Sequence, residues 1–214
     1  MGRPRSARGR AAETHRRLGA EYPGAECELD HENPFQLLAA TILSAQCTDV
    51  RVNKTTPALF SRYPGPFELA SADQQDLEQL VHPTGFYKSK AKNLLKMANQ
   101  LLDDHGGVVP EELGELVKLG GVGRKTANVI RSVAFGLPGL PVDTHVGRLA
   151  RRLGLTEEED PVKVEMALNP MVPQYERGEF SLRVILHGRQ VCFARNPQCE
   201  NCVLNDFCPA AFDF

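Results

Sequence analysis

The sequence predicts an all-α protein. Apolar residues recur at intervals of three and four along most of the chain, which is the period of an amphipathic helix. Capping residues and Pro–Gly breaks separate these runs. No stretch alternates apolar and polar residues strongly enough to indicate a strand.

The first clear helix is expected over 33–46. Asn33 is suited to cap its N-terminus and Pro34 to occupy its first position, and apolar side chains follow down one face. The polar stretch 47–56 then leads to Pro57, which can open or kink the next helix. Pro64, Gly65 and Pro66 mark a break.

Three further helices precede the middle of the chain. Ser71 and Gln74 have the spacing of a capping box ahead of a short helix. A longer helical pattern runs to Leu102 and stops at Gly106, and Pro110 is expected to start the helix after it.

The second half of the sequence continues the helical pattern. After a loop over 136–141, Asp143 stands where the N-cap of a helix belongs, and Gly154 closes that helix. Two more helices are expected over 161–170 and 178–191.

A glycine-dense turn joins two of these helices at residues 118–130. Gly120, Gly121 and Gly123 permit backbone angles closed to other residues and allow another backbone to come close. The second helix begins near Gly123, so its free amide groups are suited to a phosphate. An ordinary helix C-cap followed by another helix is the alternative.

Composition describes a globular chain. Its 214 residues, hydrophobic content of 42% and charged content of 24% are ordinary, and no apolar run reaches the ~18 residues of a membrane span. The start carries arginines but no apolar signal segment, so we expect a reducing compartment, the cytoplasm.

Charge is distributed unevenly along the chain. The net charge of −2 argues against a uniformly basic nucleic-acid binder. Residues 1–20 nevertheless hold six arginines, Arg3 among them, against Glu13 alone. This segment is either a flexible arm that touches phosphates or a solubilising tail.

Four of the six cysteines lie close together near the C-terminus. They follow the spacing C-x6-C-x2-C-x5-C, which suits either tetrahedral zinc or an iron–sulfur cluster. Cys27 and Cys47 lack partners at ligand spacing, and packing is expected for both. The four candidate ligands are Cys192, Cys199, Cys202 and Cys208.

Lys125 and Asp143 are the candidates for catalysis. An amine at the first turn of a helix feels the positive end of the dipole, which favours a neutral nucleophile able to form a Schiff base. The alternative for Lys125 is that it is a surface lysine that contacts a phosphate. The alternative for Asp143 is that it only caps its helix. Sequence alone does not supply the distance between Lys125 and Asp143.

These segments together resemble endonuclease III, a family of bifunctional DNA glycosylases of the helix-hairpin-helix superfamily. The resemblance is carried by LGGVGRKTANVI at 119–130, VDTH at 142–145 and the four cysteines. Further matching segments are LSAQCTDV at 43–50, GFYKSKA at 85–91 and ILHGR at 185–189. The resemblance spans roughly residues 15–208.

The resemblance implies a base-excision repair enzyme. It would flip an oxidised pyrimidine, such as thymine glycol, out of duplex DNA. Lys125 would attack C1′ of the sugar, and β-elimination through the resulting Schiff base would cut the strand. Asp143 would assist by activating the lysine and by stabilising charge on the sugar.

The resemblance also implies the fold, the cofactor and the DNA contacts. Residues 27–137 would form a six-helix barrel, and 1–26 with 138–214 a second lobe around a [4Fe-4S] cluster, with a DNA cleft between the two lobes. The protein would act as a monomer on double-stranded DNA, apart from any membrane, in the bacterial cytoplasm. The expected DNA contacts are Gln46, Phe86, Tyr87, Gly121, Val122, Gly123, Arg124, His145 and Arg195.

Four departures from the family pattern concern details. Gly120 replaces a frequent proline and is expected to loosen the entry to the hairpin. Phe86 replaces an aliphatic wedge, and Cys47 a common alanine. In the cluster loop, Asn196 and Gln198 replace basic residues, so a weaker hold on phosphate is expected.

Two other functions fit part of the pattern. An adenine-specific mismatch glycosylase of the same superfamily lacks the lysine nucleophile and has a further C-terminal domain. A non-catalytic helix-hairpin-helix module with structural zinc explains the glycines and cysteines, but not the joint presence of Lys125 and Asp143.

Overall fold

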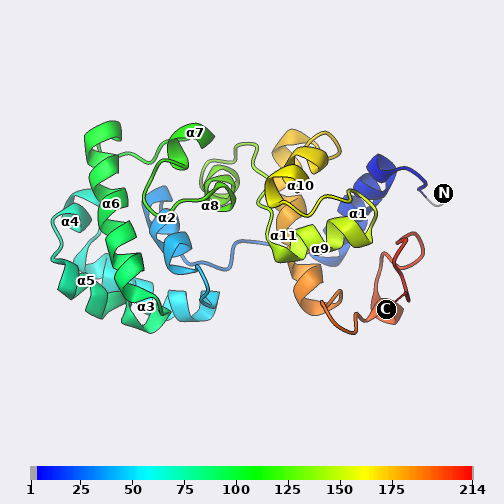
Figure 1. Ribbon diagram of the computed structural model, residues 1–214, viewed down its shortest axis with the longest axis horizontal. Coiled ribbons are helices and arrows are strands. Elements are labelled where there is room, and N and C mark those ends of the chain that lie inside the picture. The colour runs from blue at the N-terminus through cyan, green and yellow to red at the C-terminus, as the bar shows by residue number, and fades with distance from the viewer. Residues whose placement is uncertain (1–3, 214) are drawn as a thin grey trace. The chain divides into compact units, whose positions relative to one another are not determined.

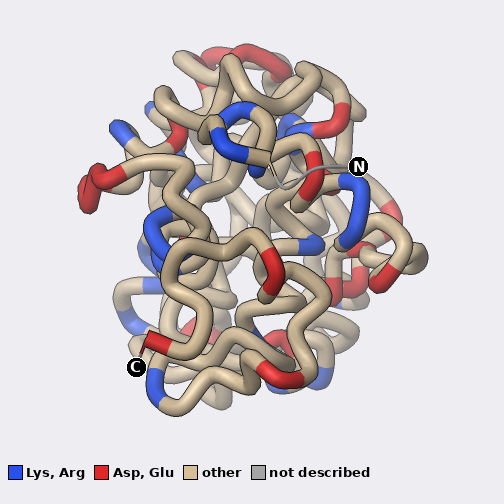
Figure 2. The backbone as a smooth tube through the Cα atoms, turned by 90° about the vertical axis from the view of Figure 1, so that its right-hand side faces the viewer, with Lys and Arg blue, Asp and Glu red and all other residues tan. Residues whose placement is uncertain are grey.

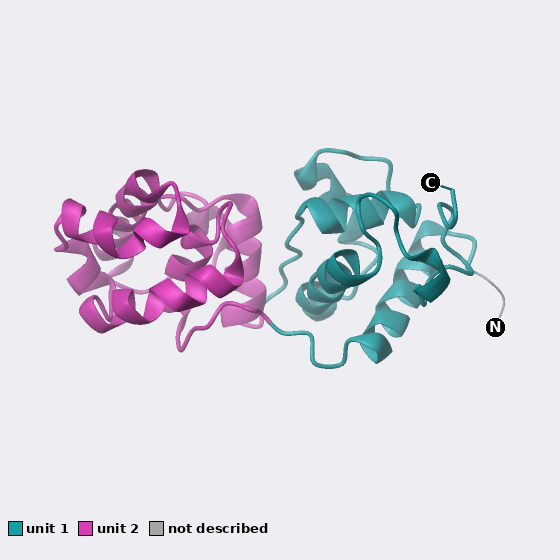
Figure 3. Ribbon diagram, turned by 90° about the horizontal axis from the view of Figure 1, so that it is seen from below, with its two compact units in different colours: residues 1–26, 137–214 teal, residues 27–136 magenta. Residues whose placement is uncertain are grey.

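The structure, a computed structural model, describes residues 4–213 and confirms the expected all-α class. No β-strand occurs in that range. The chain forms two compact units, shown in different colours in Figure 3. One comprises residues 27–136, and the other the described parts of 1–26 and 137–214.

The 27–136 unit is built around α2 (Pro34–Leu43). Asn33 caps this helix as predicted, because its side chain accepts a hydrogen bond of 2.9 Å from the N–H of Gln36. Eight of its ten residues are buried, as expected for a helix that is apolar on all sides. It contacts α3, α6 and α8 (Figure 1). The other elements are α3 (Asp49–Arg62), α4 (Pro66–Ala70), α5 (Gln74–Val81), the 3-10 turn η1 (His82–Thr84), α6 (Tyr87–His105), α7 (Leu113–Leu116), α8 (Arg124–Val129) and the π-helical turn η2 (Ile130–Ala134).

Two local predictions in this unit are wrong, and one of two alternatives is excluded at Pro57. This residue lies inside α3 and does not open it, because the buried face that includes Val52 and Leu59 holds the helix together across the missing N–H. Ser71 ends α4, while Asp73 caps α5 by accepting hydrogen bonds from two backbone N–H groups. The helix expected from Pro110 begins only at Leu113.

Helix α6 ends where the sequence predicts. Gly106 adopts the left-handed conformation with φ of 59°, and the N–H of Gly107 donates to the carbonyl of Leu101 at 2.8 Å. This is the hydrogen bond of a glycine-terminated helix. Along its length α6 contacts α4, α5, η1 and α2, so it packs against much of the part of the unit that precedes it.

The second unit is built around α11 (Arg177–Gln190), which contacts α1 (Ala7–Glu21) and α9 (Thr144–Arg152). Leu18, Leu149 and Phe180 lie in its core. Its other elements are α10 (Pro161–Leu168), which contacts α9, and the 3-10 turns η3 (Gln174–Glu176) and η4 (Cys199–Asn201).

The arginine-rich start is not a free arm over residues 7–21. It forms α1, whose apolar face is buried. Arg10 donates to the carbonyls of Leu153 and Gly154 at 2.7 and 2.6 Å, and Arg17 pairs with Asp206 at 2.6 Å. These arginines hold the helix on its own unit. Arg3 lies outside the described residues.

Basic and acidic residues both occur at many positions along the chain (Figure 2). None of the helices in residues 4–213 combines the length and apolar character that crossing a membrane requires.

Candidate functional site

The glycine turn forms a hairpin between α7 and α8. Gly121 has a φ of 76°, a conformation that favours glycine, and Gly123 caps α8. Both glycines are exposed, and their N–H groups make no backbone hydrogen bond among the described residues. Lys125 is the second residue of α8 and is exposed, whereas Val122 is buried beneath the turn.

Helix α6 braces this hairpin from below. The N–H of Gly120 donates to Oε1 of Gln100 at 2.8 Å, and Nε2 of the same side chain donates to the carbonyl of Lys118 at 3.0 Å. A Cβ at Gly120 would lie 2.8 Å from the carbonyl oxygen of Asn93. The backbone of Gly120 is therefore held by α6, and the looser entry expected relative to a proline stays a prediction. Sequence reasoning missed both α6 residues, which lie seven positions apart on one helix face.

The Cys27 thiol lies within the electrostatic reach of Lys125, in the same unit. Burial raises the pKa of the Cys27 thiol, the charge of Asp49 raises it further, and the charge of Lys125 lowers it. Both charges therefore act on this thiol. Nothing in the sequence links Cys27 to a lysine so far along the chain, which is why its position was not predicted.

Asp143 caps α9 through one carboxylate oxygen. Oδ1 accepts hydrogen bonds from the N–H groups of His145 and Val146 at 2.8 and 2.9 Å, and no partner within residues 4–213 is found for Oδ2. The carboxylate is half-buried. Its helix-cap role is therefore real, yet it leaves one oxygen for other chemistry.

His145 is tied to the loop that begins at Cys192. Its Nδ1 lies 3.1 Å from a nitrogen of Arg148, which also donates to the carbonyls of Gly188 and Cys192, both at 2.9 Å. A Cβ at Gly188 would lie 2.9 Å from Cβ of His145, so α11 and α9 cross in close contact here. The absence of a side chain at Gly188 thus sets the position of His145.

Gln46 and Phe86 share an unusual backbone conformation. Their φ values are 53° and 48°, in the left-handed region, and both side chains are exposed. Non-glycine residues in this region cluster at functional sites. Tyr87 is half-buried, with its ring 4.6 Å from that of His82.

The four C-terminal cysteines are free thiols and are all half-buried. Burial, together with the charges of the other three thiols, raises the pKa of Cys202 to about 11. The four sulfurs therefore influence one another electrostatically. Across residues 4–213, no three His, Cys, Asp or Glu side chains meet the geometry of a site for one metal ion.

Hydrogen-bond donors face two of these sulfurs. Nη1 of Arg152 donates to Sγ of Cys192 at 3.2 Å. Nε2 of His187 lies 3.2 Å from Sγ of Cys202, and the N–H of Leu204 donates to the same sulfur at 3.4 Å. Such donors stabilise thiolates, so the residues suit a thiolate-bound cluster. Arg195 is exposed on the loop from Cys192 to Cys199.

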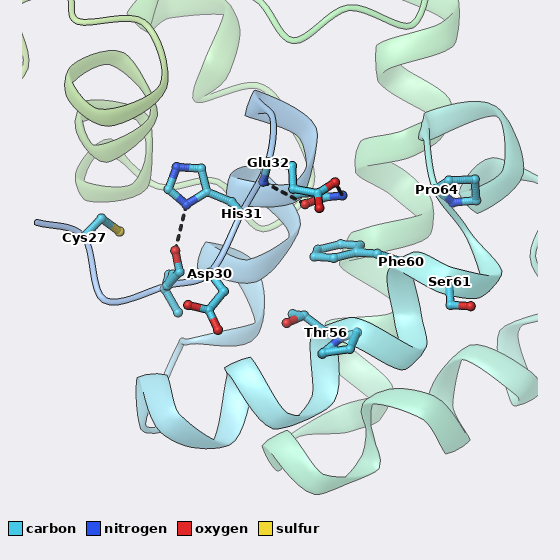
Figure 4. Close-up of a pocket in the computed structure, with 11 residues that line it drawn as sticks. Cys27, Asp30, His31, Glu32, Thr56, Phe60, Ser61 and Pro64 are labelled. Atoms are coloured by element: carbon cyan, nitrogen blue, oxygen red, sulfur yellow. Dashed lines mark hydrogen bonds between the residues drawn. The ribbon is translucent and has the colours of Figure 1, made fainter.

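A separate cavity of about 730 Å³ lies in the 27–136 unit (Figure 4). It is an open pocket lined by the loop that begins at Cys27 and by α3, with Asp30 and His31 from the loop and Phe60 from the helix. Nδ1 of His31 is hydrogen-bonded to the carbonyl of Leu29 at 2.7 Å. None of the predicted site residues lines this cavity.

Comparison with known protein families covers most of the chain. Residues 39–174 match the family described as HhH-GPD superfamily base excision DNA repair protein. Residues 192–208 match the iron–sulfur binding domain of endonuclease III. The second match assigns the four cysteines to a [4Fe-4S] cluster and not to zinc.

Characterised relatives agree with this assignment. Endonuclease III of Synechocystis sp. is 53% identical over 191 residues, which are 89% of this chain and 87% of the relative. Endonuclease III of Bacillus subtilis is 46% identical, with coverages of 90% and 88%. Endonuclease III of Escherichia coli K12 is 40% identical, with coverages of 90% and 91%.

Solved structures give the same result. A non-covalent endonuclease III–DNA complex has a TM-score of 0.90 and 41% identity, with coverages of 95% and 96%. A trapped endonuclease III–DNA covalent intermediate has the same TM-score and coverages at 42% identity. Endonuclease III enzymes are base-excision DNA glycosylases and abasic-site lyases with a [4Fe-4S] cluster, and they form one family of the HhH-GPD superfamily. The chain therefore belongs to the endonuclease III family.

Proposed function

We propose that this chain removes oxidised pyrimidines of the thymine glycol type from duplex DNA and then cuts the abasic strand by β-elimination. Lys125 is the nucleophile and Asp143 its partner. The observation that carries the proposal is the placement of Lys125, which is exposed one residue after the start of α8 and directly behind a hairpin that α6 holds rigidly. A nucleophile fixed relative to the DNA backbone gains from orientation.

The first step forms a bond between Nζ of Lys125 and C1′ of the flipped nucleotide. The glycosidic bond breaks, and the base leaves with the bonding electrons and takes up a proton. Opening of the sugar ring and loss of an amine proton then give the Schiff base. This step needs the neutral amine, so a proton must first leave Lys125.

The second step is the elimination. The positively charged Schiff base acidifies the C2′ proton, which a base removes. The electrons form the C2′–C3′ double bond, and the C3′–O bond breaks, so the 3′ phosphate leaves on the downstream strand. Water then hydrolyses the imine and returns the lysine.

Asp143 is suited to assist through Oδ2. Its Oδ1 is engaged by two backbone N–H groups, which fixes the orientation of the carboxylate. The other oxygen is then aimed by the start of α9. We assign to it the acceptance of the lysine proton and the stabilisation of positive charge that develops on the sugar.

The DNA contacts follow from local geometry. Phe86 is 67% exposed on a left-handed backbone and suits a wedge that fills the space of the flipped base, with Tyr87 behind it. Gln46 has the same backbone conformation and is assigned to the opposite strand. The remaining contacts, to phosphates, are assigned to the hairpin amides of Gly121, Val122 and Gly123 and to Arg124, His145 and Arg195.

Borohydride trapping tests the mechanism. The substrate is a duplex with one thymine glycol, and a second duplex carries a preformed abasic site. We expect a covalent protein–DNA adduct with both. Lys125→Ala is expected to abolish trapping, and Asp143→Asn to slow it.

Lys118→Ala is the matched control. This lysine lies on the other side of the hairpin, is exposed, and is paired with Glu115 at 2.7 Å. Its replacement should leave trapping intact. Trapping that persists in Lys125→Ala would reject the assigned nucleophile, and trapping only on the abasic duplex would restrict the activity to lyase.

We also propose that the enzyme acts as a monomer in the bacterial cytoplasm, where chromosomal DNA is its substrate. The relatives named above are bacterial. Light scattering of the free protein tests the first part, since a dimer would double the mass of 23.6 kDa.

A further inference from the structure

Three lysines form a row along the first half of α6. Lys88, Lys92 and Lys96 are exposed and follow one another at intervals of four residues, so they lie on one face of the helix. With a rise of about 1.5 Å per residue, the row is about 12 Å long. No acidic residue occurs between Glu78 and Asp103. We call these residues the α6 lysine row.

The row connects two of the proposed DNA contacts. Phe86 is the residue from which α6 starts. At the other end, a Cβ on Gly120 would lie 2.8 Å from Cβ of Lys96, and one on Gly121 would lie 2.9 Å from Cβ of Asn93. All these residues belong to the 27–136 unit, so one rigid helix fixes the row between the wedge and the hairpin.

The α6 lysine row is unfavourable for the helix that carries it. Positive charges at the N-terminus oppose the helix dipole, and the first turn holds no acidic residue to offset them. Like charges four residues apart also repel each other. The positive charges of the row therefore do not stabilise the helix that carries them.

Several other cations of the described chain have a carboxylate partner. Arg62 pairs with Asp76, Lys118 with Glu115, and Arg183 with Glu179. None of the three row lysines has an ion-pair partner within residues 4–213. An ordinary solvated helix face usually mixes both signs. A face with one sign instead fits a polyanion.

We propose that the α6 lysine row binds the phosphates of one DNA strand between the wedge and the hairpin. This inference rests on the proposed function. Phosphates of one strand follow each other every 3.4 Å of the helix axis, so a row of about 12 Å spans about three of them. The contact is independent of sequence. It supplies charge that the cluster loop lacks, where Arg195 is the sole basic residue in 193–198.

The salt dependence of binding measures the number of phosphates neutralised. The variant replaces all three row lysines, as Lys88→Gln, Lys92→Gln and Lys96→Gln together. The ligand is a duplex with a tetrahydrofuran abasic analogue, which cannot form the Schiff base. Dissociation constants are measured over a series of KCl concentrations.

We expect the slope of log K against log salt to become shallower by about 2.7, since each phosphate contact contributes about 0.9. The corresponding triple Lys→Arg variant should keep the wild-type slope. A second control, Lys118→Gln with Lys163→Gln, removes lysines that already have carboxylate partners and should change the slope far less. An unchanged slope in the triple Gln variant would overturn the inference.

Two further measurements separate the possible failures. Borohydride trapping of the wild-type enzyme tests the proposed function by itself. If trapping succeeds while the slope does not change, the lysine row alone is rejected. The melting temperature of the DNA-free protein should rise in the triple Gln variant, because repulsion is removed. A fall would show that the row supports the fold and would contradict the proposal.

Discussion

The ammonium group of Lys90 donates a hydrogen bond of 2.7 Å to the carbonyl oxygen of Thr84. Lys90 is only 4% exposed, and burial lowers its pKa. Thr84 is the last residue before Gly85 and Phe86, which both have left-handed backbones. A buried lysine thus ties down the chain just before the proposed wedge, at a cost in desolvation.

Lys90→Met is expected to impair base flipping more than strand cleavage. The substitution keeps the volume of the side chain but removes the donor, so the Thr84 carbonyl loses its partner and the wedge turn loosens. We expect base excision from a thymine glycol duplex to slow about tenfold, equivalent to about 1.4 kcal/mol. Cleavage of a preformed abasic site should slow less, since a missing base costs less to extrude. Single-turnover assays on the two duplexes measure both rates. An equal loss on both would show a general structural defect.

The same lysine gives the stability a specific pH dependence. The pKa of Lys90 is lowered from its ordinary value of 10.5, so the folded protein releases this proton at a lower pH than the unfolded chain. The unfolded state then binds more protons in that window, and stability rises with pH. The penalty is complete below the folded-state pKa of Lys90 and disappears as the pH approaches about 10.5. The melting temperature of the wild type, relative to Lys90→Met, should therefore increase from pH 7 to pH 10. A constant difference would contradict burial as the cause.

The hairpin tolerates no side chain at Gly120. A Cβ there would lie 2.8 Å from both the carbonyl oxygen of Asn93 and Cβ of Lys96. We expect Gly120→Ala to destabilise the protein by about 1–3 kcal/mol, the usual cost of overpacking. Gly120→Pro also removes the hydrogen bond to Gln100, which adds about 1 kcal/mol. Urea unfolding provides the measurement.

Gly114→Ala is the control for this prediction. Gly114 lies in α7, and nothing lies within 4 Å of the position of its Cβ. Alanine there should leave stability unchanged or raise it by about 0.5–1 kcal/mol, because glycine is costly inside a helix. If Gly120→Ala proves as stable as Gly114→Ala, the close approach of Gly120 to α6 does not affect the free energy of unfolding.

The sequence predicted the parts of the site that local chemistry determines. The cap at Asn33, the cap at Asp143 and the start of α8 at Gly123 each depend on a few neighbouring residues, and all three are confirmed. The helix cap predicted at Ser71 is wrong because Asp73, two residues later, caps the helix instead. Pro57 does not open a helix, because burial of one face of α3 outweighs the local preference of proline.

Groups brought together by tertiary packing were not predictable. Asn93 and Gln100 brace the hairpin across a sequence distance of about twenty residues or more. Lys125 acts electrostatically on Cys27, which lies at the other end of the unit's sequence. The arginines of α1 look like a free basic arm in the sequence, and only the carbonyl acceptors on Leu153 and Gly154 explain Arg10. Each of these contacts depends on the assembled core.

His187 is expected to raise the reduction potential of the cluster. It is 1% exposed, and burial lowers its pKa to about 4, which favours the neutral ring. Its Nδ1 lies 3.1 Å from the hydroxyl of Tyr22, which is suited to donate to it, leaving Nε2–H to donate to Sγ of Cys202 at 3.2 Å.

Hydrogen bonds to cluster sulfurs stabilise the reduced, more negative state and raise the potential. His187→Phe keeps a ring of similar size but removes this donor, so the potential should become more negative. Tyr22→Phe keeps the bond to sulfur and should shift the potential less. Voltammetry of the iron-loaded protein measures the potential, and iron content shows that the cluster is retained. If His187→Phe keeps its iron and leaves the potential unchanged, the histidine serves packing alone. If the two variants shift the potential equally, the orientation of the ring by Tyr22, and not the bond to sulfur itself, is the controlling contact.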